Sequence, residues 1–392
     1  MPTYARLPVQ FVEGRGARLW DEDGREYLDA LSGIAVCNLG HAHPAVTEAV
    51  CDQAGKLVHT SNLYGIERQE RLADRLAEHS GLEKMFFCNS GAEANEAAIK
   101  LARLYGHRRD VQSPAIVVME NSFHGRTLAT LTATGNRKVQ AGFEPLVQGF
   151  VRAPFDDVEA LERIAENNPN VVAVLVEPIQ GEGGVNMPDA DYLREVRRVC
   201  DQHGWLMMLD EIQTGVGRTG RMFAHQHAGI RPDVMTLAKG LGNGIPIGAC
   251  LAGAEAADVL GPGHHGTTFG GNPVACAAGQ AVIDTMDGES IPARAAERGE
   301  AMLGAFRERL ADEPLVRDIR GQGLMIGLEL AAPCGELVGR ALERGLLINV
   351  TAGNVIRLLP PLVIDESQAE RIVDEVVGLI REFAAEQPAG SP

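Results

Sequence analysis

Short apolar runs alternate with amphipathic segments through the middle of the chain, and this alternation constrains the fold most strongly. The apolar runs lie at 85–88, 115–119, 171–176, 205–209, 233–238 and 246–251. Between them, segments such as 92–105 and 191–203 carry apolar residues at helical spacing. Strands buried on both faces and separated by helices are typical of a mostly parallel sheet. The sequence therefore predicts an α/β fold, with a large domain built on a mostly parallel sheet flanked by helices.

Both ends of the chain have a different pattern. Residues 17–20 and 26–29 flank Asp23-Gly24, a strong hairpin signal. After residue 290 a polar helix is expected to about 311, and further elements are expected at 324–330, 335–344, 346–350, 355–359 and from 366. Because 392 residues exceed one ordinary core and chain termini often lie close together, we predict a small α+β domain formed from both termini. The predicted segments are 1–45 (small domain), 46–289 (large cofactor-binding domain) and 290–392 (small domain), and residues 387–392 are expected to be disordered.

Charge and composition narrow the class of protein. The 36 basic and 53 acidic residues give a net charge of −17, which argues against nucleic acid and anionic membranes as partners. The start of the chain lacks the basic and apolar regions of a signal peptide, and no apolar stretch approaches the roughly 18 residues that cross a bilayer. We interpret the seven cysteines as reduced core thiols, because they are scattered and form no CxxC pair. These features predict a cytoplasmic protein.

Lys239 ends one apolar run, and Asp210 ends the run before it. A carboxylate and an amine buried at strand ends are costly unless they are paired or used. Pyridoxal phosphate uses both, because a lysine forms an imine with its aldehyde and an aspartate holds its protonated ring nitrogen. Ligands of open parallel sheets bind beyond the carboxyl ends of the strands. The pair therefore indicates a cofactor site, although a helix-capping Asp210 and a surface Lys239 are the simpler interpretations of each residue alone.

Other motifs along the chain are compatible with such a site. The turn at 89–95 joins a strand to a helix through small residues, and free N–H groups there bind phosphate; an ordinary turn with an exposed Asn95 is the alternative. Phe123 could stack on a flat ring and Arg126 could bind a carboxylate, against a core phenylalanine and a solvated arginine.

Two later motifs are also open to two interpretations. The glycine-rich loop 263–273 carries Thr267 and Thr268, and Thr268 could bond a phosphate oxygen. Its adjacent His264 and His265 have no further ligand at metal spacing, so no metal is predicted. Arg357 lies in an apolar, strand-like run, where it is either a solvent-facing residue of an edge strand or a carboxylate clamp.

The order of these motifs resembles that of the class III pyridoxal-phosphate aminotransferases, from Trp20 to about Ile380. Within that class the chain is most similar to the acetylornithine aminotransferases. The resemblance rests on 27–36, 39–44, 90–92, 123–126, 176–185, 210–213, Lys239 and 267–273.

The resemblance implies the fold of fold type I pyridoxal-phosphate enzymes and assigns roles to individual residues. Lys239 would hold the cofactor as an aldimine and carry protons, Asp210 would pair with the ring nitrogen, and Phe123 would stack on the ring. Gln213 would contact the ring hydroxyl. The phosphate would be bound by the N–H groups of Gly91 and Ala92 and by Thr268, with Thr268 reaching over from the second subunit of a homodimer.

The resemblance also implies a reaction. The enzyme would move the terminal amino group of acetylornithine to 2-oxoglutarate by a ping-pong mechanism in arginine biosynthesis, giving N-acetylglutamate semialdehyde and glutamate. Arg126 would bind the remote carboxylate of acetylornithine, Arg357 the carboxylate beside the reacting carbon of glutamate, Glu182 would neutralise Arg357, and Thr267 would touch the substrate. The alternatives are another ω-aminotransferase (for succinylornithine, ornithine, succinyl-diaminopimelate or 4-aminobutyrate), a racemase or aminomutase, and a binding protein without activity.

Overall fold

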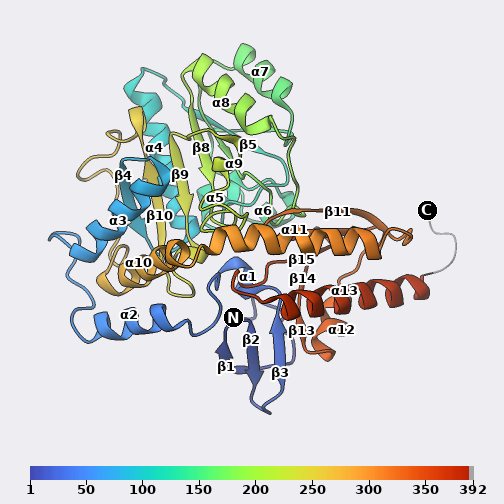
Figure 1. The fold of residues 1–392 in the computed structure, drawn as a ribbon. Helices are drawn as coiled ribbons and strands as arrows, with labels where there is room; N and C mark the ends of the chain where they lie inside the picture. Colours follow the sequence, from blue (N-terminus) through green and yellow to red (C-terminus); the bar gives the residue numbers. More distant parts are fainter. Residues whose placement is uncertain (388–392) are drawn as a thin grey trace.

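A seven-stranded sheet forms the centre of the computed structural model, which describes residues 1–387 (Figure 1). The strand order is β4-β10-β9-β8-β7-β5-β6. Strands β9, β8, β7, β5 and β6 pair in parallel, whereas β10 is antiparallel to both of its neighbours. The predicted, mostly parallel sheet is thus confirmed. The strands are β4 (Lys84–Cys88), β5 (Ala115–Met119), β6 (Phe150–Ala153), β7 (Val171–Val176), β8 (Leu206–Asp210), β9 (Val234–Leu237) and β10 (Gly248–Ala252).

Helices cover both faces of this sheet because its central strands are apolar on both sides. Ile116 and Val118 of β5 pack in a cluster with α4, while Val117 and Met119 pack in another with α7 and α8. Such two-sided burial is typical of parallel strands. The helices of this part are α2 (Pro44–Ala54), α3 (Glu67–Ser80), α4 (Gly91–Arg108), α5 (Leu128–Ala133), α6 (Arg137–Gln140), α7 (Val158–Asn167), α8 (Tyr192–His203), α9 (His225–Ala228) and α10 (Pro273–Gly288), with 3-10 turns η1 (Lys239–Leu241) and η2 (Ala254–Ala256).

The first and last parts of the chain share a sheet below this layer in Figure 1. The predicted hairpin is present as the antiparallel pair β2–β3, and β3 pairs in parallel with β13 from the C-terminal part. This pairing supports the grouping of both termini in one small domain, whose boundaries remain a prediction. The N-terminal elements are β1 (Phe11–Arg15), β2 (Arg18–Asp21), β3 (Glu26–Asp29) and the turn α1 (Ser32–Ala35).

A second small sheet, in the order β11-β12-β15-β14, lies in the C-terminal part. The long helices α11 and α13 pack on one large apolar core that reaches from α10 to the end of α13. The C-terminal elements are α11 (Ile291–Arg309), β11 (Val316–Gln322), β12 (Met325–Leu330), α12 (Leu337–Glu343), β13 (Leu346–Leu347), β14 (Asn349–Thr351), β15 (Val355–Leu358) and α13 (Glu366–Glu386).

Three details differ from the sequence prediction. The run 346–350 is not one strand, because β13 and β14 belong to different sheets. Strands β1, β6 and β11 were not predicted. All seven cysteines are free, but Cys51 is exposed and Cys37 half-buried, so the prediction of core thiols is wrong for these two. Of the tail predicted to be disordered, residues 388–392 lie outside the described part of the chain.

No helix within residues 1–387 combines the length and the apolar character that crossing a membrane requires.

Candidate active site

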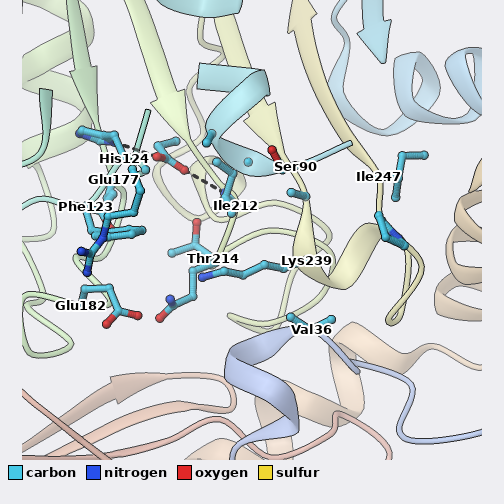
Figure 2. A pocket seen from close by; sticks show the side chains of 18 of the residues that line it. Val36, Ser90, Phe123, His124, Glu177, Glu182, Ile212, Thr214, Lys239 and Ile247 are labelled. Atoms are coloured by element: carbon cyan, nitrogen blue, oxygen red, sulfur yellow. Dashed lines mark hydrogen bonds and ion pairs between the residues drawn. The ribbon is translucent and has the colours of Figure 1, made fainter. Parts of the chain in front are cut away.

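A cavity of about 400 Å³ lies at the carboxyl ends of the parallel strands (Figure 2). Lys239 points into its centre, Val36 reaches it from the N-terminal segment, and Glu182 lies at its lower side in the view. Its lining unites most of the residues that the sequence singled out, namely Gly91, Ala92, Phe123, Arg126, Glu182, Asp210, Gln213 and Lys239.

Lys239 begins the 3-10 turn η1, shortly after β9 ends at Leu237. Its backbone is left-handed, with φ of 45°, a costly conformation for a side chain of this size. Burial lowers the pKa of Lys239, and the nearby carboxylate of Glu182 opposes this effect only in part. A larger share of neutral amine is therefore present than for a surface lysine, and a neutral amine is the form that attacks carbonyl groups and accepts protons.

Asp210 ends β8 and is held from three directions. Its Oδ2 accepts hydrogen bonds from Asn95 Nδ2 at 2.8 Å and pairs with His124 Nδ1 at 2.7 Å. Its Oδ1 accepts the backbone N–H of Ile212 at 3.1 Å. Asn95 is oriented in turn by Thr236, whose hydroxyl donates to Asn95 Oδ1 at 2.8 Å. These bonds fix the carboxylate, which is 4% exposed at the cavity wall.

The N-terminus of α4 opens into the same cavity. Ser90 caps the helix by accepting from Glu93 N, and the first intrahelical bond runs from Ala94 N to Ser90 O. Gly91 and Ala92, whose N–H groups precede that bond, line the cavity. A Cβ on Gly91 would lie 2.7 Å from Ile212 Cδ1, so a larger residue there would displace the Ile212 side chain at the cavity wall. The arrangement is suited to an anionic group.

The loop that follows β5 carries Phe123 and Arg126. Glu177 fixes this loop, because its Oε2 accepts the N–H of Phe123 at 3.0 Å. Burial, with the adjacent charge of Asp210, raises the pKa of Glu177 well above its ordinary value. Arg126 is exposed, and its Cζ lies 5.7 Å from the centre of the Phe123 ring. Phe123 is half-buried at the cavity wall rather than a core residue.

Arg357 lies on β15, which has β12 on one side and β14 on the other. It is fully buried, so the interpretation as a solvent-facing arginine on an edge strand is wrong. Its guanidinium donates to Glu182 Oε1 at 2.6 Å, to Gln213 Oε1 at 3.3 Å and to Asn349 Oδ1 at 2.9 Å. Burial acts to raise the pKa of Glu182, but the charge and hydrogen bond of Arg357, together with the charge of Lys239 and a hydrogen bond from Gln213, keep this pKa below its usual value. Arg357 and Glu182 therefore form an ion pair beside Lys239.

Thr267 and Thr268 do not line the cavity within one chain. Thr268 is exposed, and Thr267 Oγ1 accepts from Asn89 Nδ2 at 3.3 Å and from Gly270 N at 3.2 Å. The nearby His265 packs against Phe86 with the two rings tilted by 46°, and its Nδ1 contacts Lys100 Nζ. Residues 1–387 contain no group of three His, Cys, Asp or Glu side chains able to hold a metal ion.

Comparisons with known proteins agree with this geometry. Residues 2–380 match the Aminotransferase class-III family. The chain belongs to the class-III aminotransferase family.

Individual aminotransferases are similar to this one over nearly the full length. The acetylornithine aminotransferase of Nitrosomonas europaea is 61% identical, over 98% of each chain. The structure of the ornithine aminotransferase from Toxoplasma gondii ME49 superposes with a TM-score of 0.95 at 36% identity, covering 99% of this chain and 93% of that one. The N-acetylornithine aminotransferase of Stenotrophomonas maltophilia K279a gives a TM-score of 0.85 at 36% identity, over 98% of each chain.

Aminotransferases of this class depend on pyridoxal phosphate, and the cavity fits that group. It combines an amine at Lys239, a fixed carboxylate at Asp210 and an anion site at the α4 N-terminus, with an aromatic side chain at Phe123. These are the groups that an aldehyde, a protonated ring nitrogen, a phosphate and a flat ring require. The chain is a pyridoxal-phosphate-dependent aminotransferase.

Three residues around the cavity were missed as functional candidates. His124 and Glu177 lie inside motifs that carry the resemblance, and Asn95 was considered only as an exposed residue. All three are buried. The position of Asn95 on the same face of the helix as Ala98, Ile99 and Ala102 was a usable signal, because a polar residue on an apolar helix face needs a buried partner.

Proposed function

We propose that this aminotransferase transfers the terminal amino group of acetylornithine to 2-oxoglutarate, giving N-acetylglutamate semialdehyde and glutamate. The identity of 61% to an acetylornithine aminotransferase over nearly the whole chain carries the proposal. The Glu182–Arg357 ion pair supports it, because a substrate whose reacting carbon bears no carboxylate requires that the arginine be neutralised.

Pyridoxal phosphate, when bound, supplies an aldehyde that exchanges amino groups and a ring that withdraws electrons. In the proposed arrangement Gly91 and Ala92 would bind the phosphate together with Thr268 of the second subunit, Phe123 would stack on the ring and Gln213 would contact the ring hydroxyl. Asp210 stabilises a positive charge on the ring nitrogen, and its bonds to Asn95 and His124 hold it in place.

Lys239 is the proposed nucleophile and proton carrier. In one half-reaction its Nζ accepts the proton from the substrate carbon that bears the amine. In the other half-reaction, which runs in reverse, the same Nζ returns a proton to the corresponding carbon of 2-oxoglutarate. The lowered pKa of Lys239 favours the neutral amine that this step needs. Because η1 and the preceding strand fix its backbone, the amine is placed before substrate enters.

Two arginines provide the proposed carboxylate sites. Arg126, exposed at the cavity wall, binds the remote carboxylate of acetylornithine, with Thr267 as a further contact. Arg357 binds the carboxylate beside the reacting carbon of glutamate or 2-oxoglutarate. Glu182 neutralises Arg357 during the acetylornithine half-reaction and moves aside when glutamate arrives; its side chain is 34% exposed, which leaves room for this movement.

We further propose that the enzyme is a cytoplasmic homodimer that serves arginine biosynthesis. The exposed position of Thr268, outside the cavity of its own chain, supports a role in the partner's site. The exposed apolar side chains of Leu57, Leu63, Tyr64 and Phe269 support an interface near this loop.

The absorbance of the purified holoenzyme tests the proposed reaction. Adding acetylornithine alone is expected to remove the visible band of the lysine-bound cofactor, and 2-oxoglutarate is expected to restore it. A band that acetylornithine leaves unchanged refutes the proposal.

Ornithine is the second candidate substrate, favoured by the TM-score of 0.95 to an ornithine aminotransferase. Competition among acetylornithine, succinylornithine, ornithine, succinyl-diaminopimelate and 4-aminobutyrate separates the candidates. The substrate with the highest kcat/KM identifies the function, and a preference for free ornithine would replace the proposal above.

A further inference from the structure

Arg218 and Arg357 are the two largest fully buried side chains among residues 1–387, and none of the roles above uses Arg218. Its Nη1 donates to Leu324 O at 2.9 Å and to Pro360 O at 2.6 Å. Its Nη2 donates to Asn38 Oδ1 at 2.7 Å and to Ser32 Oγ at 3.3 Å. All four acceptors are neutral oxygen atoms. Burial lowers the pKa of Arg218 to about 9, and the nearby charge of Asp29 offsets this only in part. A buried charge with so little compensation is expensive, so a purely stabilising role is a poor explanation for this guanidinium.

The four acceptors belong to segments that shape the cavity. Pro360 closely follows Arg357 on the continuation of β15, and Leu324 directly precedes β12, the neighbour of β15. Ser32 and Asn38 flank Val36, which lines the cavity. Arg218 itself lies on the loop that begins at Asp210. The guanidinium of Arg218 thus joins the loop that begins at Asp210 to the N-terminal and C-terminal segments.

The N-terminal segment needs such support because its backbone is strained. Ser32, Gly33, Ile34 and Ala35 all have left-handed φ values, of 48°, 65°, 67° and 57°. A left-handed turn is unfavourable for L-residues, above all for a β-branched one such as Ile34. Strained backbone persists only where the surrounding structure fixes it, and it gathers at functional sites.

The turn at 32–35 contacts both Arg218 and the residue that follows β15. Ser32 Oγ donates to Leu359 O at 2.6 Å and accepts from Arg218. Asn38 Nδ2 donates to Val216 O at 2.8 Å, and Leu362 N donates to Asn38 O at 2.7 Å. The turn, the Arg218 loop and the residues after Arg357 therefore form one hydrogen-bonded unit, which we name the Arg218 cluster (Ser32, Asn38, Arg218 and Pro360).

Close backbone contact at Gly323 restricts how far the backbone of the Arg218 cluster can move. Leu324 N donates to Arg218 O at 3.0 Å. A Cβ at Gly323 would lie 2.6 Å from the same Arg218 O. The backbone on both sides of the guanidinium is therefore fixed, and a shorter side chain at position 218 cannot reach all four acceptors.

We propose that Arg218 is a positioning residue that sets Arg357 and the Val36 wall relative to the loop carrying Asp210 and Gln213. The Arg357 Nη1–Gln213 Oε1 contact of 3.3 Å is the point where this alignment reaches the cavity. The inference rests on the proposed role of Arg357 in binding the carboxylate of 2-oxoglutarate. Arg218 touches neither substrate nor cofactor, so its loss acts on carboxylate binding and leaves the cofactor on Lys239.

Arg218→Lys tests this inference in the holoenzyme, because lysine keeps the charge but lacks the planar fork. The KM for 2-oxoglutarate, measured with whichever amine donor the wild-type enzyme accepts, is expected to rise at least about tenfold, since small misplacements of binding groups are costly. The kcat is expected to fall less, and the visible absorbance of the bound cofactor is expected to remain. Ser32→Ala removes one acceptor of the same guanidinium and is expected to raise this KM in the same direction by a smaller factor.

Arg197→Lys is the matched control. Arg197 of α8 is also a mostly buried arginine, 16% exposed, and it pairs with Asp201 and Asp233 away from the cavity. It is expected to lower the melting temperature without changing the KM for 2-oxoglutarate. An unchanged KM in Arg218→Lys, or a loss of melting temperature alone as in Arg197→Lys, overturns the inference; if Arg218→Lys does not fold, an unchanged KM in Ser32→Ala does so. Failure of the wild-type enzyme to use acetylornithine would refute the proposed substrate and leave this test intact.

Discussion

The Glu182–Arg357 pair offers the sharpest test of how one cavity serves two different substrates. Arg357 is 1% exposed and Glu182 34% exposed, and their contact is 2.6 Å long. Glu182→Gln keeps an oxygen acceptor for Arg357 but removes the charge that neutralises it. The uncompensated arginine is expected to favour 2-oxoglutarate and glutamate, which carry a carboxylate for it, and to disfavour acetylornithine.

The expected size of the effect of Glu182→Gln follows from how far the Glu182–Arg357 pair is exposed to solvent. Exposed ion pairs contribute up to about 1 kcal/mol, and breaking a buried pair costs about 3–5 kcal/mol. A half-buried carboxylate on a buried arginine falls between these values, at about 2 kcal/mol. At 1.4 kcal/mol per factor of ten, this corresponds to about a thirtyfold change in the ratio of the two half-reactions.

Single-turnover absorbance measurements give each half-reaction separately. In Glu182→Gln the rate constant for acetylornithine divided by its apparent dissociation constant is expected to fall relative to the same quantity for glutamate. Glu329→Gln is the matched control, because Glu329 is 31% exposed and pairs with Arg320 at 2.7 Å without lining the cavity. An equal change in both half-reactions, or the same change in Glu329→Gln, would refute the reasoning.

Three further predictions follow from the site and its surroundings. Lys239→Ala is expected to abolish turnover and the visible absorbance of the bound cofactor; normal steady-state activity would exclude Lys239 as the cofactor lysine. Arg126→Ala is expected to raise the KM for acetylornithine about tenfold with a smaller change in kcat, because a charge-assisted contact is lost; an unchanged KM would rule out its carboxylate role. Burial acts to lower the pKa of His41, but its 2.7 Å contact with Asp29, through both hydrogen bond and charge, and the neighbouring Cys37 together outweigh this and raise the pKa to about 9. A raised folded-state pKa contributes stability that is complete below the ordinary pKa of 6.5 and is lost as the pH rises through about 9. His41→Asn is therefore expected to make the melting temperature fall less between pH 6.5 and 9. A fall as large as in the wild-type enzyme would contradict this role of His41.

The sequence predicted those parts of the fold and site that repeat or end a regular pattern. Asp210 and Lys239 stood out because each ends an apolar run, and parallel strands bring such ends together. The role of Glu182 came only from the resemblance, since nothing in its glycine-rich surroundings indicates an ion pair with a residue as distant in sequence as Arg357.

Contacts between segments without periodicity could not be predicted. Arg218 lies in a glycine-rich loop, and its four acceptors come from both ends of the chain. The apolar run 346–350 shows no sign that β13 and β14 enter different sheets, because pairing partners depend on tertiary contacts rather than on local pattern. His124 was part of a recognised motif, but its partner Asp210 becomes evident only once β5 and β8 lie in one sheet.

The reversed strand β10 has a consequence for the engineering of this enzyme. Because β10 is antiparallel to β9, the chain returns to the sheet directly after Lys239, without a crossover helix. The lysine is thus anchored between two neighbouring strands of the large sheet, whereas Val36 and Arg357 come from the two ends of the chain. Directed evolution toward new amines can therefore vary the terminal segments while the reactive amine and its aspartate stay in a constant framework.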